Sequence, residues 1–215
     1  MSVSYKEVMK KIIQEKENGV ITSKEITELG IHRSVLKDFV QSGEIYQYRR
    51  GIYVKSDAWE DEFFLLQLKY ERGIFSHETA LYLLGYSDRC PCKFTMTFPQ
   101  GYNCHSLKSE NVIVKKALKE NYELGIIEIK SPCGNMIKVY DFERTLCDCL
   151  KGQGTDVQII NPAMRKYVFS SDINILKLIK YSEQLHVKGK ISKYLEVLLW
   201  LLKKPIITKH KKLII

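Results

Sequence analysis

Polar side chains of the kinds that read DNA bases recur along one short segment near the amino terminus. Arg, Lys and Gln can form paired hydrogen bonds with base edges in the major groove, while Ser and backbone amides hold phosphate oxygens. Here they alternate, at helical spacing, with the apolar residues Val35, Leu36, Phe39 and Val40. We therefore expect a helix over about residues 32–42, with its apolar face inward and four candidate base-reading residues outward: Arg33, Ser34, Lys37 and Gln41.

A helix-turn-helix would position this polar face. Thr22 and Glu25 stand three residues apart ahead of an apolar residue, which is the spacing of a capping box at the start of a helix. Gly30 would end that first helix and Gly43 the second, because glycine readily adopts the left-handed conformation found after helices. The sequence thus predicts two short helices joined by a tight turn around Ile31.

A β-hairpin is expected to follow the second helix. Residues 45–48 and 52–54 have the composition of short strands, and Arg49, Arg50 and Gly51 form the turn between them. Two helices and such a hairpin make a winged helix-turn-helix, whose second helix enters the major groove of duplex DNA. Further candidate contacts, to phosphates or to the minor groove, lie at the helix starts and on the hairpin: Thr22, Ser23, Lys24, His32, Tyr46, Tyr48, Arg49 and Arg50.

Two other interpretations of these residues stay open. A solvated polar face is the ordinary outer side of an amphipathic helix, and the two tyrosines could simply cover a small core. Winged helices also serve as protein-binding modules, which would make the chain an adaptor. Salt dependence separates DNA binding from the adaptor, because only the neutralisation of phosphates gives a steep loss of affinity with salt.

The composition favours a polyanionic partner. The chain has 215 residues and a formal net charge of +9, with a pI near 9.1. Residues 1–55 hold ten Lys and Arg against seven Asp and Glu, a net of +3, so the excess is spread along the chain. Part of it lies at the carboxyl end, in residues 203–212, either as a frayed basic tail or as a phosphate contact.

The sequence gives no sign of export, of a membrane span or of a metal. Residues 1–19 carry charges where a signal peptide has its apolar core, and the apolar run at 194–202 is shorter than the roughly 20 residues needed to cross a bilayer. We expect a cytoplasmic protein whose six cysteines are reduced thiols. The C-x-C spacings at 90–92 and 147–149 differ from those of zinc knuckles, so neither a metal nor another cofactor is expected.

A second domain is expected after the hairpin. Residues 1–56 would be the winged helix-turn-helix and residues 57–215 a mixed α/β domain, with a small sheet at about 93–139 followed by helices at about 141–202. This order indicates an α+β fold class.

Within the second domain, residues 58–70 are expected to form a helix with Trp59 on its apolar side, and residues 75–85 a helix capped by Ser76. Residues 93–98 alternate as a half-buried strand would. The other expected elements are strands at 112–115, 126–130 and 137–139, and helices at 142–151, 161–168, 174–185 and 191–202.

Four segments together resemble the AbiE-type abortive-infection antitoxins of bacterial type IV toxin-antitoxin systems. They are RRGIYV at 49–54, SHETALYLLGYSD at 76–88, TMTFPQG at 95–101 and YDFERTLCDCL at 140–150. The resemblance spans roughly residues 1–185. It implies a non-enzymatic repressor that binds inverted repeats in the promoter of its own operon. It also implies that the C-terminal domain opposes a nucleotidyltransferase-like toxin without needing a stable complex.

Charged residues in these C-terminal motifs have a structural and a functional interpretation. In the structural interpretation, Asp141 caps a helix, and Arg144 and Asp148 form an ion pair one helical turn apart. Functionally, the same region could be the surface used against the toxin. The residues expected on that antitoxin surface are His77, Glu78, Glu143, Arg144 and Asp148.

A metal-dependent nuclease is the enzyme alternative. Glu128 and Lys130 make an E-x-K element whose two side chains share one side of an expected strand, as a metal ligand and a neighbouring cation would. No Asp between Asp88 and Asp141 supplies a second ligand. Divalent-metal dependence distinguishes the two classes, because a repressor binds its operator in chelator without cleaving it.

Overall fold

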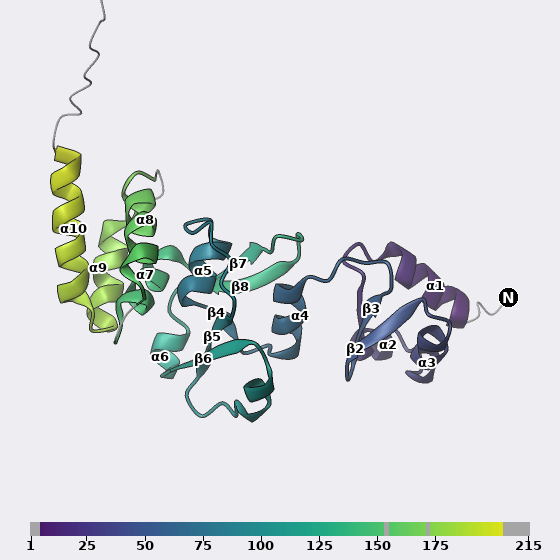
Figure 1. Ribbon diagram of the computed structural model, residues 1–215. Coiled ribbons are helices and arrows are strands. Elements are labelled where there is room, and N and C mark those ends of the chain that lie inside the picture. Colours follow the sequence, from purple (N-terminus) through teal and green to yellow (C-terminus); the bar gives the residue numbers. More distant parts are fainter. Residues whose placement is uncertain (1–4, 153–154, 171–172, 204–215) are drawn as a thin grey trace, which may run out of the picture. The chain divides into compact units, whose positions relative to one another are not determined.

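The computed structural model describes residues 5–152, 155–170 and 173–203 (Figure 1). The chain divides into two compact units, one formed by residues 1–66 with 130–136 and the other by residues 67–129 with 137–215. Of the basic carboxyl-terminal segment, residues 204–212 lie outside the described residues.

The first unit combines three helices with a small antiparallel sheet. Met9 and Ile13 of the first helix pack with Leu36 and Phe39 of the third and with Ile45 of the sheet, all of them buried. The strands are hydrogen-bonded in the order β1-β3-β2. The elements are α1 (Tyr5–Glu15), β1 (Val20–Thr22), α2 (Ser23–Glu28), α3 (Ser34–Gln41), β2 (Ile45–Arg49) and β3 (Ile52–Lys55).

Local signals set the ends of these elements. Thr22 and Glu25 form the expected capping box, in which each side chain accepts a hydrogen bond from the other residue's backbone N–H, at 3.2 and 2.9 Å. Gly30 and Gly43 follow the two helices with φ of +72° and +78°. One detail of the prediction is wrong: Val40 is exposed, whereas Leu36 and Phe39 of α3 are buried and Val35 packs partly buried against the same core.

The helix expected over residues 58–70 is shorter and begins later, as α4 (Glu62–Lys69). Asp61 precedes it, and its carboxylate accepts a hydrogen bond from the N–H of Phe64 at 3.1 Å and one from the amide of Asn135 at 2.8 Å. These bonds fix Asp61 as the residue at the helix start. Trp59 therefore lies outside the helix, with a side chain that is 91% exposed rather than on an apolar side.

The second unit is built on a mixed sheet with the order β6-β5-β4-β8-β7. β5 pairs antiparallel with β4 and parallel with β6. Both faces of β5 are covered, because Thr97 contacts Ser76 on one side and Phe98 packs against Tyr70 on the other. Residues 95–98 are therefore all buried, and the expectation of a half-buried strand is wrong. The strands are β4 (Ile74–Phe75), β5 (Phe94–Pro99), β6 (Val112–Ala117), β7 (Ile126–Lys130) and β8 (Met136–Tyr140).

Helices cover this sheet and extend the core beyond it. Figure 1 shows α7, α8, α9 and α10 packed beside one another at the carboxyl-terminal end of the unit. Leu146, Met164, Tyr167 and Leu178 form part of their shared apolar core. The helices are α5 (His77–Leu83), η1 (His105–Ser109, 3-10), α6 (Lys119–Tyr122), α7 (Phe142–Leu150), α8 (Val157–Val168), α9 (Ile175–Gln184) and α10 (Lys188–Lys203).

The mixture of sheets and helices agrees with the expected α+β class. Two differences concern order and length. The expected helix at 75–85 is α5, but it follows the unexpected strand β4, and the short helix α6 lies between β6 and β7, where no helix was expected. α8 begins four residues earlier than expected, at Val157, because the Asp156 carboxylate accepts a hydrogen bond from the N–H of Gln158 at 2.9 Å.

Candidate nucleic-acid interface

The polar face of α3 is open to solvent. Leu36 and Phe39 pack into the core, so the residues on the opposite side of the helix face solvent. Lys37 and Gln41 lie one helical turn apart on this side, and both are exposed. Among the described residues, neither has a hydrogen-bond or ion-pair partner, so both side chains are available to a ligand.

The start of α3 carries two preorganised side chains. The Arg33 Nε donates a hydrogen bond to the Thr27 hydroxyl of α2 at 2.9 Å. This bond uses one of the five guanidinium donors and leaves four on an exposed side chain. His32 Nδ1 lies 2.8 Å from the Ser34 hydroxyl and accepts a hydrogen bond from the Ser34 N–H at 3.3 Å. Both contacts orient exposed polar groups before any partner binds.

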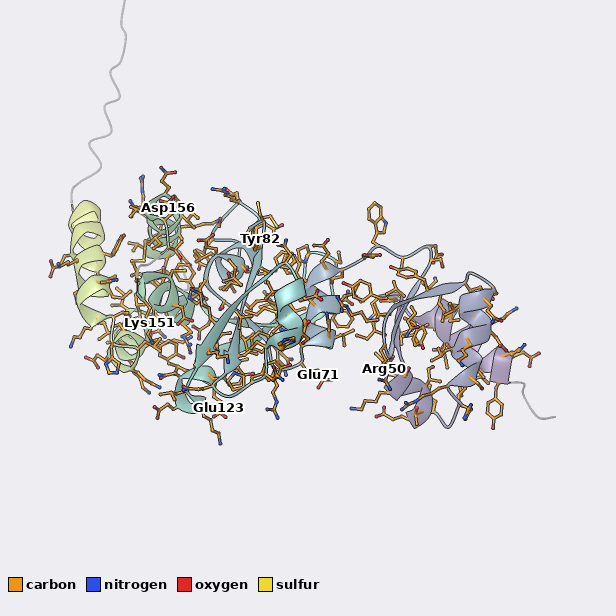
Figure 2. The ribbon with its side chains drawn as sticks, turned by 60° about the horizontal axis from the view of Figure 1, so that its bottom comes forward. Arg50, Glu71, Tyr82, Glu123, Lys151 and Asp156 are labelled. Carbon is orange, nitrogen blue, oxygen red and sulfur yellow. The ribbon has the colours of Figure 1, made fainter. Side chains whose placement is uncertain are left out.

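The start of α2 meets the turn of the β2–β3 hairpin. The N–H of Ser23 donates to the carbonyl of Gly51 at 2.8 Å, which places the first residue of α2 beside the hairpin tip. Arg50 stands at that tip, exposed to solvent (Figure 2). Lys24 is also exposed, and its Nζ lies 4.0 Å from a carboxylate oxygen of Glu28. Two expected phosphate contacts, Lys24 and Arg50, are thus brought to one region.

The side chain of Thr22 is engaged in hydrogen bonds at the start of α2. Its hydroxyl accepts from the N–H of Glu25 and donates to the Glu25 carboxylate at 3.1 Å, while Lys16 donates to the same carboxylate at 2.5 Å. Burial raises the pKa of Glu25, but the hydrogen bonds from Lys16 and Thr22 outweigh it, so the net shift is downward. The side chain of Thr22 therefore holds α2 in place rather than facing outward.

The two hairpin tyrosines lie on the sheet face away from α3. Side chains alternate along β2, so Tyr46 and Tyr48 point opposite to Ile45, which packs against the helices. The Tyr46 hydroxyl donates to the Glu60 carboxylate. Burial and this carboxylate raise the Tyr46 pKa to about 12. The structure does not bring Tyr46 and Tyr48 together with the polar side of α3, whereas Arg49 and Arg50 extend beyond the core.

Sequence reasoning missed two residues at this surface. Thr27 is a polar residue of α2 that holds Arg33, and its role depends on how two helices cross. Gln47 is exposed, and its side chain lies on the same face of β2 as that of Ile45, which is the face toward α3. Strict alternation from the buried Ile45 was the signal that could have found Gln47.

Most of the residues expected on an antitoxin surface are buried in the second unit. Arg144 is 2% exposed: its Nε donates to Asp148 at 3.0 Å, its Nη1 donates to the Leu124 carbonyl at 3.0 Å, and its guanidinium lies 4.2 Å from the Tyr140 ring centre. Burial raises the Asp148 pKa, and the Arg144 charge opposes that shift.

Glu143 is 5% exposed and accepts a hydrogen bond from the Tyr167 hydroxyl at 2.9 Å. Lys177 Nζ lies 3.2 Å from Glu143 and 3.0 Å from Asp141, which caps α7 through the N–H of Arg144. Glu143 and Arg144 thus stabilise the packing of α7, and their side chains are not accessible to a macromolecule.

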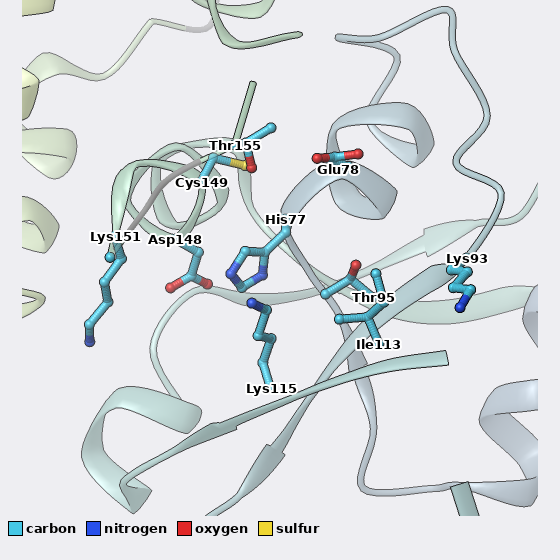
Figure 3. A pocket seen from close by; sticks show the side chains of 11 residues that line it. His77, Glu78, Lys93, Thr95, Ile113, Lys115, Asp148, Cys149, Lys151 and Thr155 are labelled. Atoms are coloured by element: carbon cyan, nitrogen blue, oxygen red, sulfur yellow. The ribbon is translucent and has the colours of Figure 1, made fainter. Parts of the chain in front are cut away.

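His77 and Glu78 are partly exposed, and together with Asp148 they line an open cavity of about 370 Å³ (Figure 3). His77 has a φ of +53°, which is rare for a residue other than glycine. Burial, followed by the charges of Lys115, Arg144 and Lys151, lowers the pKa of His77 to about 3. The imidazole is therefore neutral at physiological pH.

The described residues give no support to a metal centre. In that part of the chain no group of three or more His, Cys, Asp or Glu side chains is arranged to hold a metal ion. Cys147 and Cys149 are both buried in α7, where burial raises the pKa of each thiol to about 12, and Cys90 and Cys92 are exposed. Among the described helices, none is long and apolar enough to span a bilayer.

Residues 11–54 match the family described as transcriptional regulator, AbiEi antitoxin. The match runs from the second half of α1 into β3, and it confirms the resemblance to this family in that segment. A solved structure with a similar fold is the crystal structure of the RV2827C protein from Mycobacterium tuberculosis, with 15% identity and a TM-score of 0.57. That comparison covers 92% of this chain and 82% of the other, and it bears on the fold alone. The comparison with curated proteins gave no match.

Proposed function

We propose that this chain, whose residues 11–54 match the AbiEi antitoxin regulators, is the antitoxin and autorepressor of a type IV toxin-antitoxin operon that acts in abortive phage infection. Residues 1–56 act as a winged helix-turn-helix that binds inverted repeats in the operon promoter. Residues 57–215 antagonise a nucleotidyltransferase-like toxin in the cytoplasm, without a stable complex. The chain itself catalyses no reaction in this account.

The observation that carries the DNA-binding part is the exposed face of α3. Lys37 and Gln41 have no partner in the described part of the chain, and Arg33 is already oriented by Thr27. A helix held in this way by its apolar side suits the major groove, where such side chains reach base edges. Lys24 and Arg50, which the contact between Ser23 and Gly51 brings together, suit the flanking phosphates.

A protein-binding adaptor is the main competing function for the first unit. The two functions differ in salt dependence, because each phosphate that a cation neutralises releases counterions and steepens the loss of affinity with salt. Titrating the full chain into a duplex carrying its own promoter, in chelator and at several salt concentrations, distinguishes them. We expect tight, strongly salt-dependent binding and an intact duplex. Salt-independent or absent binding favours the adaptor, and cleavage that needs a divalent metal favours the nuclease.

Substitutions on α3 test base reading. Arg33→Ala or Lys37→Ala is expected to cost about 1–3 kcal/mol of operator affinity and to relax the sequence preference at one position. Lys10→Ala is the matched control, because Lys10 is an exposed lysine on α1 outside this face. If Lys10→Ala weakens binding as much as Lys37→Ala does, Lys37 contributes to operator affinity through its positive charge alone and does not read a base.

Arg50 tests the phosphate contact at the hairpin tip. Arg50→Ala is expected to weaken binding to all sequences alike and to reduce the slope of log affinity against log salt by about one. The same titrations on operator and unrelated duplexes measure this. A loss confined to the operator would assign Arg50 to base reading instead.

A further inference from the structure

A second polar site lies in the second unit, which contains none of the residues assigned to DNA. Its centre is the cavity of about 370 Å³ next to His77, which adjoins another of about 320 Å³. His77, Lys115, Asp148, Lys151 and Gly152 line both. The shared lining makes one continuous recess large enough for a small organic ligand.

Cations dominate the lining. Lys93, Lys115, Lys116 and Lys151 border the two cavities, and among the described residues none of their side-chain ammonium groups has a hydrogen-bond or ion-pair partner. Of the two acidic residues, Asp148 is already paired with Arg144 at 3.0 Å, which leaves Glu78. An anionic ligand would therefore meet several ammonium groups that make no ion pair within 4 Å in the described part of the chain.

The strand pairing places one of these lysines next to His77. β5 and β6 run parallel with Thr97 opposite Lys115, so the two side chains lie on the same side of the sheet. Figure 3 shows the His77 ring, the Lys115 ammonium and the Asp148 carboxylate pointing toward one another. The sequence alone does not indicate that these three side chains are close, because they come from the separate elements α5, β6 and α7.

A chain of hydroxyls orients the His77 ring. The Thr97 hydroxyl donates to Ser76 Oγ at 2.9 Å, and Ser76 Oγ lies 3.1 Å from His77 Nδ1. Since Ser76 accepts from Thr97, its own proton is free to go to Nδ1. In the tautomer that accepts this proton at Nδ1, the ring carries its own proton on Nε2, for which the described part of the chain offers no hydrogen-bond partner. Ser76 and Thr97 are both buried, so this arrangement is built into the fold.

We propose that this recess binds a small phosphate ester of nucleotide size. Lys115 and Lys151 are the charged ligands of the phosphate group, and the neutral His77 donates to it through Nε2–H. The second cavity, which includes Leu118, Leu185 and Gln100, receives the organic part, because it offers both apolar surface and an amide. Inorganic phosphate alone would leave most of the recess to water. This inference does not rest on the DNA-binding proposal.

The test uses the full chain and four mononucleotides, AMP, GMP, CMP and UMP, with inorganic phosphate and adenosine as the separate parts. Calorimetric titration is expected to show saturable binding of at least one mononucleotide, with weaker binding of phosphate and of adenosine. Lys115→Gln and Lys151→Gln are each expected to reduce the affinity about tenfold, as the loss of a charge-assisted hydrogen bond does. Lys180→Gln, an exposed lysine of α9 outside the recess, is expected to change nothing.

A measurement on the unaltered chain keeps the test independent of variant folding. In NMR spectra, the mononucleotide that binds is expected to shift the ring signals of His77 and to leave those of the exposed His32 unchanged. The proposal is overturned if no mononucleotide binds, or if binding survives in both lysine variants. It is also overturned if inorganic phosphate binds as tightly as every mononucleotide, or if an oligonucleotide shifts His77 at lower concentration than any of them.

Discussion

Arg33 is held by a residue that need not touch DNA. Its Nε bonds to the Thr27 hydroxyl, which removes part of the rotational freedom that a long side chain otherwise loses on binding. At the scale of single residues, specificity in this account depends on Thr27 as well as on the side chain that reads the base.

Replacing Thr27 by Val removes the hydroxyl and keeps the shape of the side chain. We expect the ratio of operator to unrelated-duplex affinity to fall several-fold, because Arg33 then has to be ordered during binding. Thr27 is exposed, so the free energy of unfolding should change by less than about 1 kcal/mol. Competition binding with both duplexes measures the ratio. An unchanged ratio would show that Arg33 needs no such support.

His77 gives a prediction for pH. The unfolded chain takes up a proton at this side chain near its ordinary pKa of 6.5, whereas the folded chain does so only at about 3. Between these values the unfolded state binds more protons, so stability falls as the pH falls. The free energy of unfolding should therefore decrease on the order of 1 kcal/mol per pH unit from about 6 to 4, relative to His77→Gln. Denaturant titrations at several pH values measure it, and parallel curves for both proteins would contradict it.

Single residues differ in how well the sequence predicts their surroundings. The exposure of Lys37 and Gln41 follows from helical periodicity, because one buried face defines the other. The burial of Glu143 does not follow, since it depends on Tyr167 and Lys177 from α8 and α9. An acidic residue in the first turn of a helix usually faces solvent, and only the packing of three helices makes it part of the core.

Elements are predictable where their ends carry local signals. The capping box at Thr22 set the start of α2, and glycines marked the ends of α2 and α3. β4 was missed because a strand of two residues, Ile74–Phe75, has no periodicity, and it exists only through pairing with β5 and β8. The burial of both sides of β5 likewise depends on residues distant in the sequence, because Ser76 contacts one side and Tyr70 the other.

The entry into β7 gives a prediction at this scale. Gly125 has a φ of +77°, and a Cβ there would lie 2.9 Å from both the Arg144 Cβ and the Asp141 carboxylate. Both neighbours are buried and hydrogen-bonded, so neither can yield easily. We expect Gly125→Ala to lower the free energy of unfolding by about 2–4 kcal/mol, which combines backbone strain and overpacking.

Gly85→Ala is the matched control for that substitution. Gly85 has a similar φ of +74°, but a Cβ there meets nothing within 4 Å. Its cost is expected to be about 1–2 kcal/mol, from the backbone conformation alone. Denaturant unfolding of both variants measures the difference, and equal costs would mean that the contacts around Arg144 adjust freely.

At the scale of the whole molecule, the DNA-binding face and the phosphate-ester site that we propose belong to different units of the chain. The first unit presents the face that we assign to promoter DNA, and the match to AbiEi regulators falls entirely within it. The second unit holds the buried network around Arg144 and the basic recess around His77. Of the net charge of +9, only +3 falls in residues 1–55, so total charge alone does not identify the DNA-binding face.

Operator affinity of the full chain with Arg33, Lys37 and Arg50 all changed to Ala tests the central claim most directly. We predict that this variant keeps the unfolding midpoint of the parent chain, because all three side chains are exposed, and that it loses at least about a hundredfold in affinity for the promoter repeats. The parent and the Lys10→Ala control should bind alike. Unchanged affinity in the triple variant would show that the polar face of α3 and the hairpin tip do not bind DNA.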